Sequence, residues 1–159
     1  MSSTREEITQ VLLTILGGVP GFVGVHRNRG DIDPIDAETK VPNLPAVTLL
    51  DGKQVVVSKF GKSVGGQMPP SLMLFQPEIW VLLLPRATSE NLGTGEEMSA
   101  FEIAILKAIA RDQSLRACLE PTGYIEYSGC DTDMQTGSPM EGQMRMNFGF
   151  AYVLDPTTL

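Results

Sequence analysis

Residues that mark metal sites and disulfide frameworks are scarce in this 159-residue chain, which has two cysteines and one histidine. Cys118 and Cys130 stand outside any Cys-x-x-Cys pair, and with His26 they are too few for a zinc site without carboxylates. Disulfides belong mainly to oxidising compartments, so we expect two free thiols in a cytosolic setting. A chain of this length buries about 70% of its unfolded surface and needs neither kind of cross-link.

Basic charge and long apolar runs are also in short supply. The chain carries 12 Lys and Arg against 19 Asp and Glu, a formal net charge of -7. Tight binding to nucleic acid needs clustered Lys and Arg that displace counterions, so this balance argues against it. The longest apolar runs, residues 11–16 and 79–85, are too short to span a bilayer. Residues 1–10 contain acidic side chains and no apolar core, so we expect no signal peptide there. We also expect no membrane partner.

Motifs for nucleotide binding and nucleophilic catalysis are missing as well. Residues 61–63 end like a phosphate-binding loop, but Val56 stands where that motif requires glycine. Residues 93–95 lack the third glycine of a dinucleotide fingerprint. No Gly-x-Ser-x-Gly elbow occurs, and the segment at Cys130 has no histidine nearby in sequence. We therefore predict no enzymatic activity and no cofactor.

The strongest enzyme-like cluster is a set of carboxylates, Asp131, Asp133 and Glu141, which we expect in a polar turn over residues 131–142. Such a turn could hold Mg²⁺ or Ca²⁺, whose preferred ligands are oxygens. The spacing matches no EF-hand loop, and acidic loop side chains are usually solvated. A small metal-dependent hydrolase that uses this turn is the alternative from a different functional class.

The most regular pattern in the chain lies at residues 143–154. Large apolar side chains alternate there with small or polar ones, which is typical of a strand with one apolar face. The apolar face carries Met144, Met146, Phe148, Phe150, Tyr152 and Leu154. Its length favours a central strand that other elements cover, and the alternation at residues 124–127 predicts a strand before it.

Hydrophobic spacing places the other elements. Ser3 and Glu6 fit a capping box before an amphipathic helix that ends near residues 17–21. A second helix is predicted over residues 96–112, with Ile103 and Leu106 widening its apolar stripe and a further turn at 114–119. Strands are predicted at 22–28, 46–50, 54–59 and 72–84, with Asp51 and Gly52 forming a hairpin turn. Residues 31–45, 61–71 and 87–95 are predicted to be polar loops.

This order predicts one α+β domain over residues 1–159: a mixed, mostly antiparallel sheet with two main helices packed on one face. Residues 80–84 are apolar on both faces of their strand, so they must be covered.

The chain resembles the tail terminator, or tail completion, proteins of long-tailed phages and phage-derived particles. The resemblance spans nearly the whole sequence. It is carried by REEI at residues 5–8 through VPG at 19–21, LPAVTLLDG at 44–52, PEIWV at 77–81, ILKAI at 105–109, GYIEYSGC at 123–130, MEGQM at 140–144 and YVLDP at 152–156.

That resemblance implies a structural protein without enzymatic activity that assembles as a ring, typically a hexamer. The ring caps the tail tube, stops its polymerisation and offers a surface for head joining. The implied partners are copies of itself, the tail tube protein and the head–tail connector protein, while DNA passes through the lumen without specific binding. The implied location is the host cytoplasm during assembly and then the head-proximal end of the virion tail. A head–tail connector or neck protein is the alternative within the same class.

Assembly contacts are expected in the two later polar loops and in the final turn. Charged pairs in such contacts set register and partner choice more than affinity. We expect deletion of residues 61–71 to leave the fold intact and impair tail joining. The candidate interface residues are Lys62, Gln67, Met68, Glu90, Asn91, Asp131, Asp133, Glu141 and Arg145.

Overall fold

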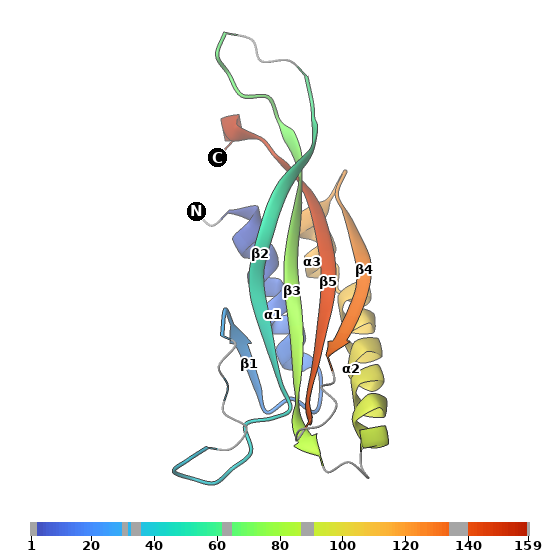
Figure 1. Ribbon diagram of the computed structural model, residues 1–159. Coiled ribbons are helices and arrows are strands. Elements are labelled where there is room, and N and C mark those ends of the chain that lie inside the picture. The colour runs from blue at the N-terminus through green and yellow to red at the C-terminus, as the bar shows by residue number, and fades with distance from the viewer. Residues whose placement is uncertain are drawn as a thin grey trace.

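In the computed structural model, three α-helices pack on one face of a five-stranded sheet (Figure 1). The structure describes residues 3–29, 32, 36–61, 65–86, 91–133 and 140–158. The helices are α1 (Thr4–Gly18), α2 (Asn91–Arg111), α3 (Gln113–Leu119) and a short 3-10 helix, η2 (Pro156–Thr158). The strands are β1 (Gly24–Arg27), β2 (Ala46–Lys59), β3 (Ser71–Arg86), β4 (Tyr124–Asp133) and β5 (Met140–Leu154).

The strand order across the sheet is β1-β2-β3-β5-β4. β1 runs parallel to β2, and every other neighbouring pair is antiparallel. The α+β architecture with a mixed, mostly antiparallel sheet is therefore confirmed. The long C-terminal strand, β5, lies between β3 and β4 as its pattern predicted. In Figure 1 the helices lie together behind the sheet.

The core lies between the helices and one face of β3 and β5. Alternate residues of both strands point into it, as the period-2 pattern predicted. Phe148 is 3% exposed and packs between the rings of Tyr127 and Phe150, with centroids 4.9 and 6.0 Å away. The helices contribute Ile8, Leu12, Leu16, Met98, Ile105, Ile109 and Leu115.

α1 follows its predicted pattern at both ends. The Ser3 hydroxyl accepts a hydrogen bond from the Glu6 backbone N–H and so caps the helix. The helix ends at Gly18 and places its predicted apolar stripe against the sheet. In a capping box the Glu6 carboxylate would accept from the Ser3 backbone N–H. Here it binds the Arg27 guanidinium on β1 instead.

β2 is one continuous strand, so the predicted hairpin at Asp51 and Gly52 is wrong. These two residues form a β-bulge opposite Pro77, between the pairs Leu50–Glu78 and Lys53–Gln76. Gly52 has φ +60°, and a Cβ there would lie 2.0 Å from the Gln76 carbonyl oxygen. Pro77 has no N–H to offer a ladder bond, so the bulge leaves no backbone donor unpaired on the β3 side.

The real turn of the β2–β3 hairpin lies within residues 60–70, where the Phe60 N–H donates to the Pro70 carbonyl.

The second helix begins earlier than predicted. α2 starts at Asn91, so residues 91–95 belong to the helix and not to a polar loop. Ile103 is 51% exposed, and its predicted place in the apolar stripe is wrong. The buried residues Met98, Ile105 and Ile109 define the packed side, and Ile103 falls away from it at the helical period. α3 confirms the additional turn expected at residues 114–119.

The two final strands are longer than predicted, and this removes most of the expected acidic turn. Asp131 and Asp133 lie in β4, and Glu141 lies in β5, all within strands. Gly129 has φ +103° at a register shift between Tyr127 and Gly129, after which the ladder with β5 continues. Pairing with β5 thus makes the end of β4 extended, although its sequence has little strand propensity. Residues 134–139, the rest of the predicted turn, lie outside the described part of the chain.

Candidate assembly surfaces

One face of the sheet lies away from the helices, and among the described residues no helix packs on it. Its centre carries a cluster of charged and aromatic side chains from three adjacent strands: Glu78 and Trp80 on β3, Arg145 on β5 and Asp131 on β4. Trp80 pairs across the strands with Arg145, and Arg145 pairs with Asp131. Two of the predicted interface residues, Asp131 and Arg145, are thereby brought together.

The contacts within this cluster centre on Arg145. Its Nη2 donates to Asp131 Oδ2 at 2.7 Å, and its Nη1 lies 3.8 Å from Glu78 Oε1. The guanidinium also lies over the Trp80 ring, 5.7 Å from its centroid, and the Trp80 indole N–H donates to Glu78 Oε2 at 3.1 Å. The hydrogen bond from Arg145 holds the pKa of Asp131 below its usual range.

The second surface is the arm formed by the far ends of β2 and β3. In Figure 1 it rises beyond the helices at the top of the sheet. Val55, Val56 and Val57 are 40%, 50% and 48% exposed, although successive strand residues point to opposite faces. Both faces of β2 are therefore exposed at these positions, although their partners on β3, Leu74 and Met73, are only 8% and 9% exposed. Phe60, at 44%, and Met68, at 70%, extend the exposed apolar surface into the connection.

The outer edge of this arm is unpaired among the described residues. β1 pairs with β2 only from Ala46 to Leu49, and β3 occupies the other edge of the strand. The backbone groups that point outward from residues 53–59 are therefore free to bond a further strand.

The remaining candidate residues have mixed outcomes. Gln67 and Met68 are exposed in the arm, as predicted. Lys62 and Glu90 lie outside the described residues. Asn91, Asp133 and Glu141 have described backbones within α2, β4 and β5, but their side chains lie outside the described set. Within the described part of the chain no group of three or more His, Cys, Asp or Glu residues is placed to hold a metal ion.

Sequence reasoning missed an ionic link among α1, β1 and β2. Arg27 binds Glu6 through both carboxylate oxygens at 2.8 and 2.9 Å, and it binds Asp51 at 2.9 and 3.0 Å. These bonds lower the pKa of both carboxyl groups. The Asn28 side chain accepts from the Asp51 N–H and fixes the same bulge. Nothing in the local sequence pairs residues so far apart, so only the fold reveals the link.

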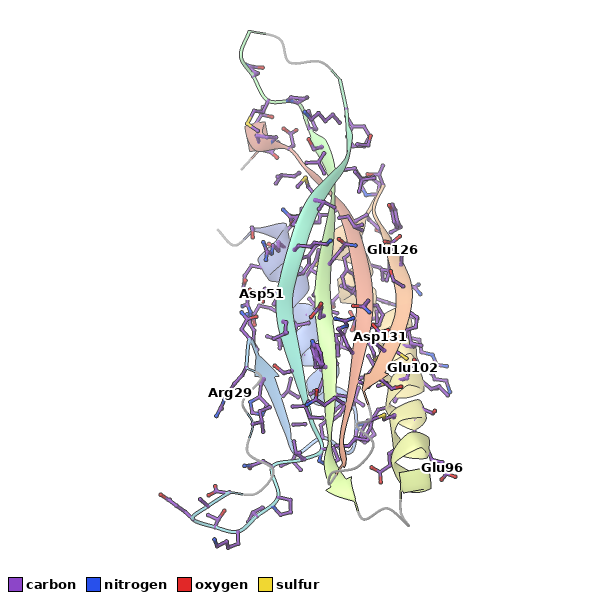
Figure 2. All side chains as sticks on the ribbon, in the orientation of Figure 1. Arg29, Asp51, Glu96, Glu102, Glu126 and Asp131 are labelled. Carbon is purple, nitrogen blue, oxygen red and sulfur yellow. The ribbon has the colours of Figure 1, made fainter. Side chains whose placement is uncertain are left out.

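A second missed feature lies between the helices and β4. The Glu102 carboxylate on α2 accepts from the Tyr127 hydroxyl at 2.8 Å and from the Cys130 thiol at 2.5 Å (Figure 2 labels Glu102). The Glu102 bond raises the pKa of Cys130, while burial is the main cause of the raised pKa of Tyr127. Both cysteines are free.

Close to this point, at the Tyr124 end of β4, lies a cavity of about 580 Å³. Its apolar wall comes from Leu106, Ile109, Leu119, Ile125, Tyr127 and Phe148.

No family model matches the chain, and no curated protein shows significant sequence similarity to it. Over the described residues, no helix combines the length and apolar character needed to cross a membrane.

Proposed function

We propose that this protein is a structural assembly protein that caps a phage tail tube as a ring, stops the growth of the tube and presents a surface for head joining. It performs no catalysis and uses no cofactor. Its partners are copies of itself, the tail tube protein and the head–tail connector protein. DNA passes through the lumen without specific contacts, and the ring, taken as a hexamer, forms in the host cytoplasm and stays at the head-proximal end of the tail.

The observation that carries this proposal is the exposed apolar arm. Val55, Val56, Val57, Phe60 and Met68 are each 40% or more exposed. An exposed apolar edge strand left without a partner invites uncontrolled association, so proteins normally cover such edges. A partner that covers the arm in the finished particle explains why these side chains are apolar.

The positions of the carboxylates support the hydrolase alternative less well than they support a contact surface. The Asp131 carboxylate is held by Arg145 at 2.7 Å, so its charge is already neutralised within the chain. Asp131 and Glu141 also lie within the strands β4 and β5, whereas the carboxylates of known calcium-binding loops come from a single loop. The sheet face that carries Asp131 therefore fits a contact surface better than a metal centre.

The test uses purified tail tube protein that polymerises in vitro, with tube length measured by negative-stain electron microscopy. Wild-type protein should shorten the tubes and mark one of their ends. With the variant V55T/V56T/V57T, tubes should grow as long as they do when no capping protein is added. The variant makes three of the five exposed apolar side chains of the arm polar and changes no core residue.

The matched control is V23T/V41T/I103T, which removes three valine or isoleucine side chains that are 51–55% exposed away from the arm. This control should cap tubes like wild type. Capping by the arm variant at the wild-type level would contradict the proposal. Binding to the connector protein without any effect on tubes would assign the chain to the neck instead.

A further inference from the structure

We infer that the outer edge of β4 and the cavity beside it form one docking site for an extended segment of a partner protein, in which aromatic and basic residues alternate. The inference rests on the proposed function and deepens it, because it gives the chemistry by which the chain recognises a partner in the particle. Two features meet at this border of the sheet. β4 pairs only with β5 among the described strands, and a cavity of about 580 Å³ lies next to β4 on the helix side.

The edge of β4 presents backbone hydrogen-bonding groups. In an antiparallel pair, alternate residues turn their N–H and C=O groups away from the neighbouring strand. β4 is the last strand of the sheet, so its outward groups meet no further described strand (Figure 1). An extended segment that adds to such an edge gains main-chain hydrogen bonds whatever its sequence. Recognition of a particular sequence therefore depends on the side chains at the two faces of the added strand.

The face toward the helices recognises apolar side chains. Ile125 and Tyr127 point to that side, because they pair across the strands with the core residues Phe150 and Phe148. Both are only half-buried, since the cavity separates them from α2 and α3. Further apolar lining comes from Leu106, Ile109 and Leu119. The volume lies in the range of about 300–1,000 Å³ that is typical of ligand pockets, so a side chain on the added strand has room to enter.

The cavity opens to solvent, because its lining includes the exposed residues Ala110, Arg116 and Tyr124. Apolar walls that stay in contact with water contribute nothing to the stability of the single chain. A side chain that fills the cavity removes this surface from water. Aromatic side chains bury the largest area, so we expect them at the positions of the added strand that face the helices.

The opposite face of β4 recognises positive charge. It carries Glu126 and Asp131, both exposed, and β4 contains no basic residue (Figure 2). Glu126 lies over Gly149 of β5, since a Cβ on that glycine would lie 2.8 Å from Glu126 Oε1. Asp131 already binds Arg145, so Glu126 is the carboxylate that we expect to meet a basic side chain. Opposite charges on neighbouring strands attract, so Lys or Arg should alternate with the aromatic residues of the added strand.

A second copy of the chain does not supply such a segment from its described edges. β1 comprises only Gly24–Arg27 and contains no aromatic residue. The outer edge of β2, residues 53–59, contains three consecutive valines and does not alternate apolar with basic side chains. Two β4 edges would bring carboxylates of both copies together, and like charges oppose association. The partner is therefore a different protein.

Synthetic peptides test the sequence preference of the site. Isothermal titration calorimetry with the full-length protein should show one acetyl-KWKWKWK-amide peptide bound per chain. The peptide KKKKWWW has the same composition and should bind at least about tenfold more weakly, because it cannot place Trp and Lys on opposite faces of a strand. EWEWEWE should also bind at least about tenfold more weakly, because its charge is reversed. Equal affinities for the three peptides, or no binding of the first, would overturn the inference.

Two substitutions in the protein test the two faces separately. A110W fills the cavity from α2 and should weaken binding of KWKWKWK at least about tenfold. Its matched control, A100W, places the same side chain at an exposed position of α2 outside the cavity and should bind like wild type. E126K should weaken binding of KWKWKWK and strengthen binding of EWEWEWE. Its matched control, E96K, reverses an exposed carboxylate at the other end of α2 and should change neither affinity. Wild-type affinities in A110W or E126K would overturn the inference.

Peptide N-methylation tests the strand pairing itself. The N–H groups of alternate residues in a strand point to the same edge, so methylation of the three Trp nitrogens blocks one edge of KWKWKWK and methylation of the Lys nitrogens blocks the other. Exactly one of these two methylated peptides should bind like the parent peptide. Binding of both, or of neither, would overturn the addition of a strand to β4.

Failure of the docking site is distinguishable from failure of the proposed function. Capped tubes together with no peptide binding would refute the docking site alone. Peptide binding by a protein that leaves tubes unchanged would refute tube capping alone. Self-association of the wild-type protein that A110W abolishes would show that a second copy occupies the cavity, and it would overturn the assignment of the site to a different protein.

Discussion

Arg27 joins three separate elements of the chain, α1, β1 and β2. Its guanidinium binds Glu6 on α1 and Asp51 at the β2 bulge. R27A should lower the free energy of unfolding by about 1–3 kcal/mol, because it leaves the half-buried Asp51 carboxylate without its charged partner. Urea denaturation measures the loss. The control R111A removes an exposed arginine at the end of α2 and should change stability by less than about 0.5 kcal/mol.

The same ion pairs set a dependence on pH. Arg27 lowers the folded-state pKa of Glu6 and of Asp51 below their ordinary values of 4.5 and 3.8. Their contribution to stability is therefore complete above those values and is lost as the pH falls through the lower folded-state pKa values. The difference in melting temperature between wild type and R27A should be constant near neutral pH and shrink below about pH 4. A difference that persists unchanged into strong acid would refute this origin.

Gly52 and Gly17 make a pair of glycines with opposite predicted effects. G52A should destabilise the protein by about 2 kcal/mol or more, because φ is +60° and the new Cβ would meet the Gln76 carbonyl. Gly17 lies inside α1 with no atom near its Cβ position, so G17A should stabilise by about 0.5–1 kcal/mol. Thermal melts should show a lower melting temperature than wild type for G52A and a higher one for G17A.

Among the elements, β5 carries three buried aromatic side chains, Phe148, Phe150 and Tyr152. F148A should cost about 3–5 kcal/mol in urea denaturation, because the ring is 3% exposed between Tyr127 and Phe150. V153A, on the same strand but 38% exposed, is the control and should cost little. A loss well under about 1 kcal/mol for F148A would mean that this face of β5 is not core.

Elements with a strong hydrophobic periodicity were predictable from the sequence. Elements whose conformation depends on contacts with distant residues were not. β5 and α1 follow one repeat over many residues, so local pattern and tertiary packing agree. Asp51 and Gly52 carry a strong hairpin signal, yet Arg27, Asn28 and Pro77 select a bulge there. The acidic end of β4 has no strand pattern of its own and is extended because β5 pairs with it.

The candidate surfaces divide in the same way. Asp131 and Arg145 were both singled out from the sequence, and the structure joins them at 2.7 Å. The exposure of Val55, Val56 and Val57 was not predicted, because consecutive valines usually indicate a covered strand. Their exposure follows from the length of β2, which extends past the helices that cover the rest of the sheet.

At the scale of the whole molecule, the chain combines a well-packed core on one side of its sheet with open surfaces elsewhere. The helices bury one face, while the cluster at Arg145 lies on the other and the arm extends past both. An isolated domain gains no stability from an apolar arm that stays in water. This arrangement agrees with the proposed role as an assembly subunit, whose contacts would form only when neighbours bind.

The most direct test of the tail-capping account is negative-stain electron microscopy of the wild-type protein mixed with purified tail tubes. The account predicts ring-shaped particles seated at one end of each tube, and tubes that stop growing once the rings are bound. Isolated globules beside tubes that continue to lengthen would contradict it.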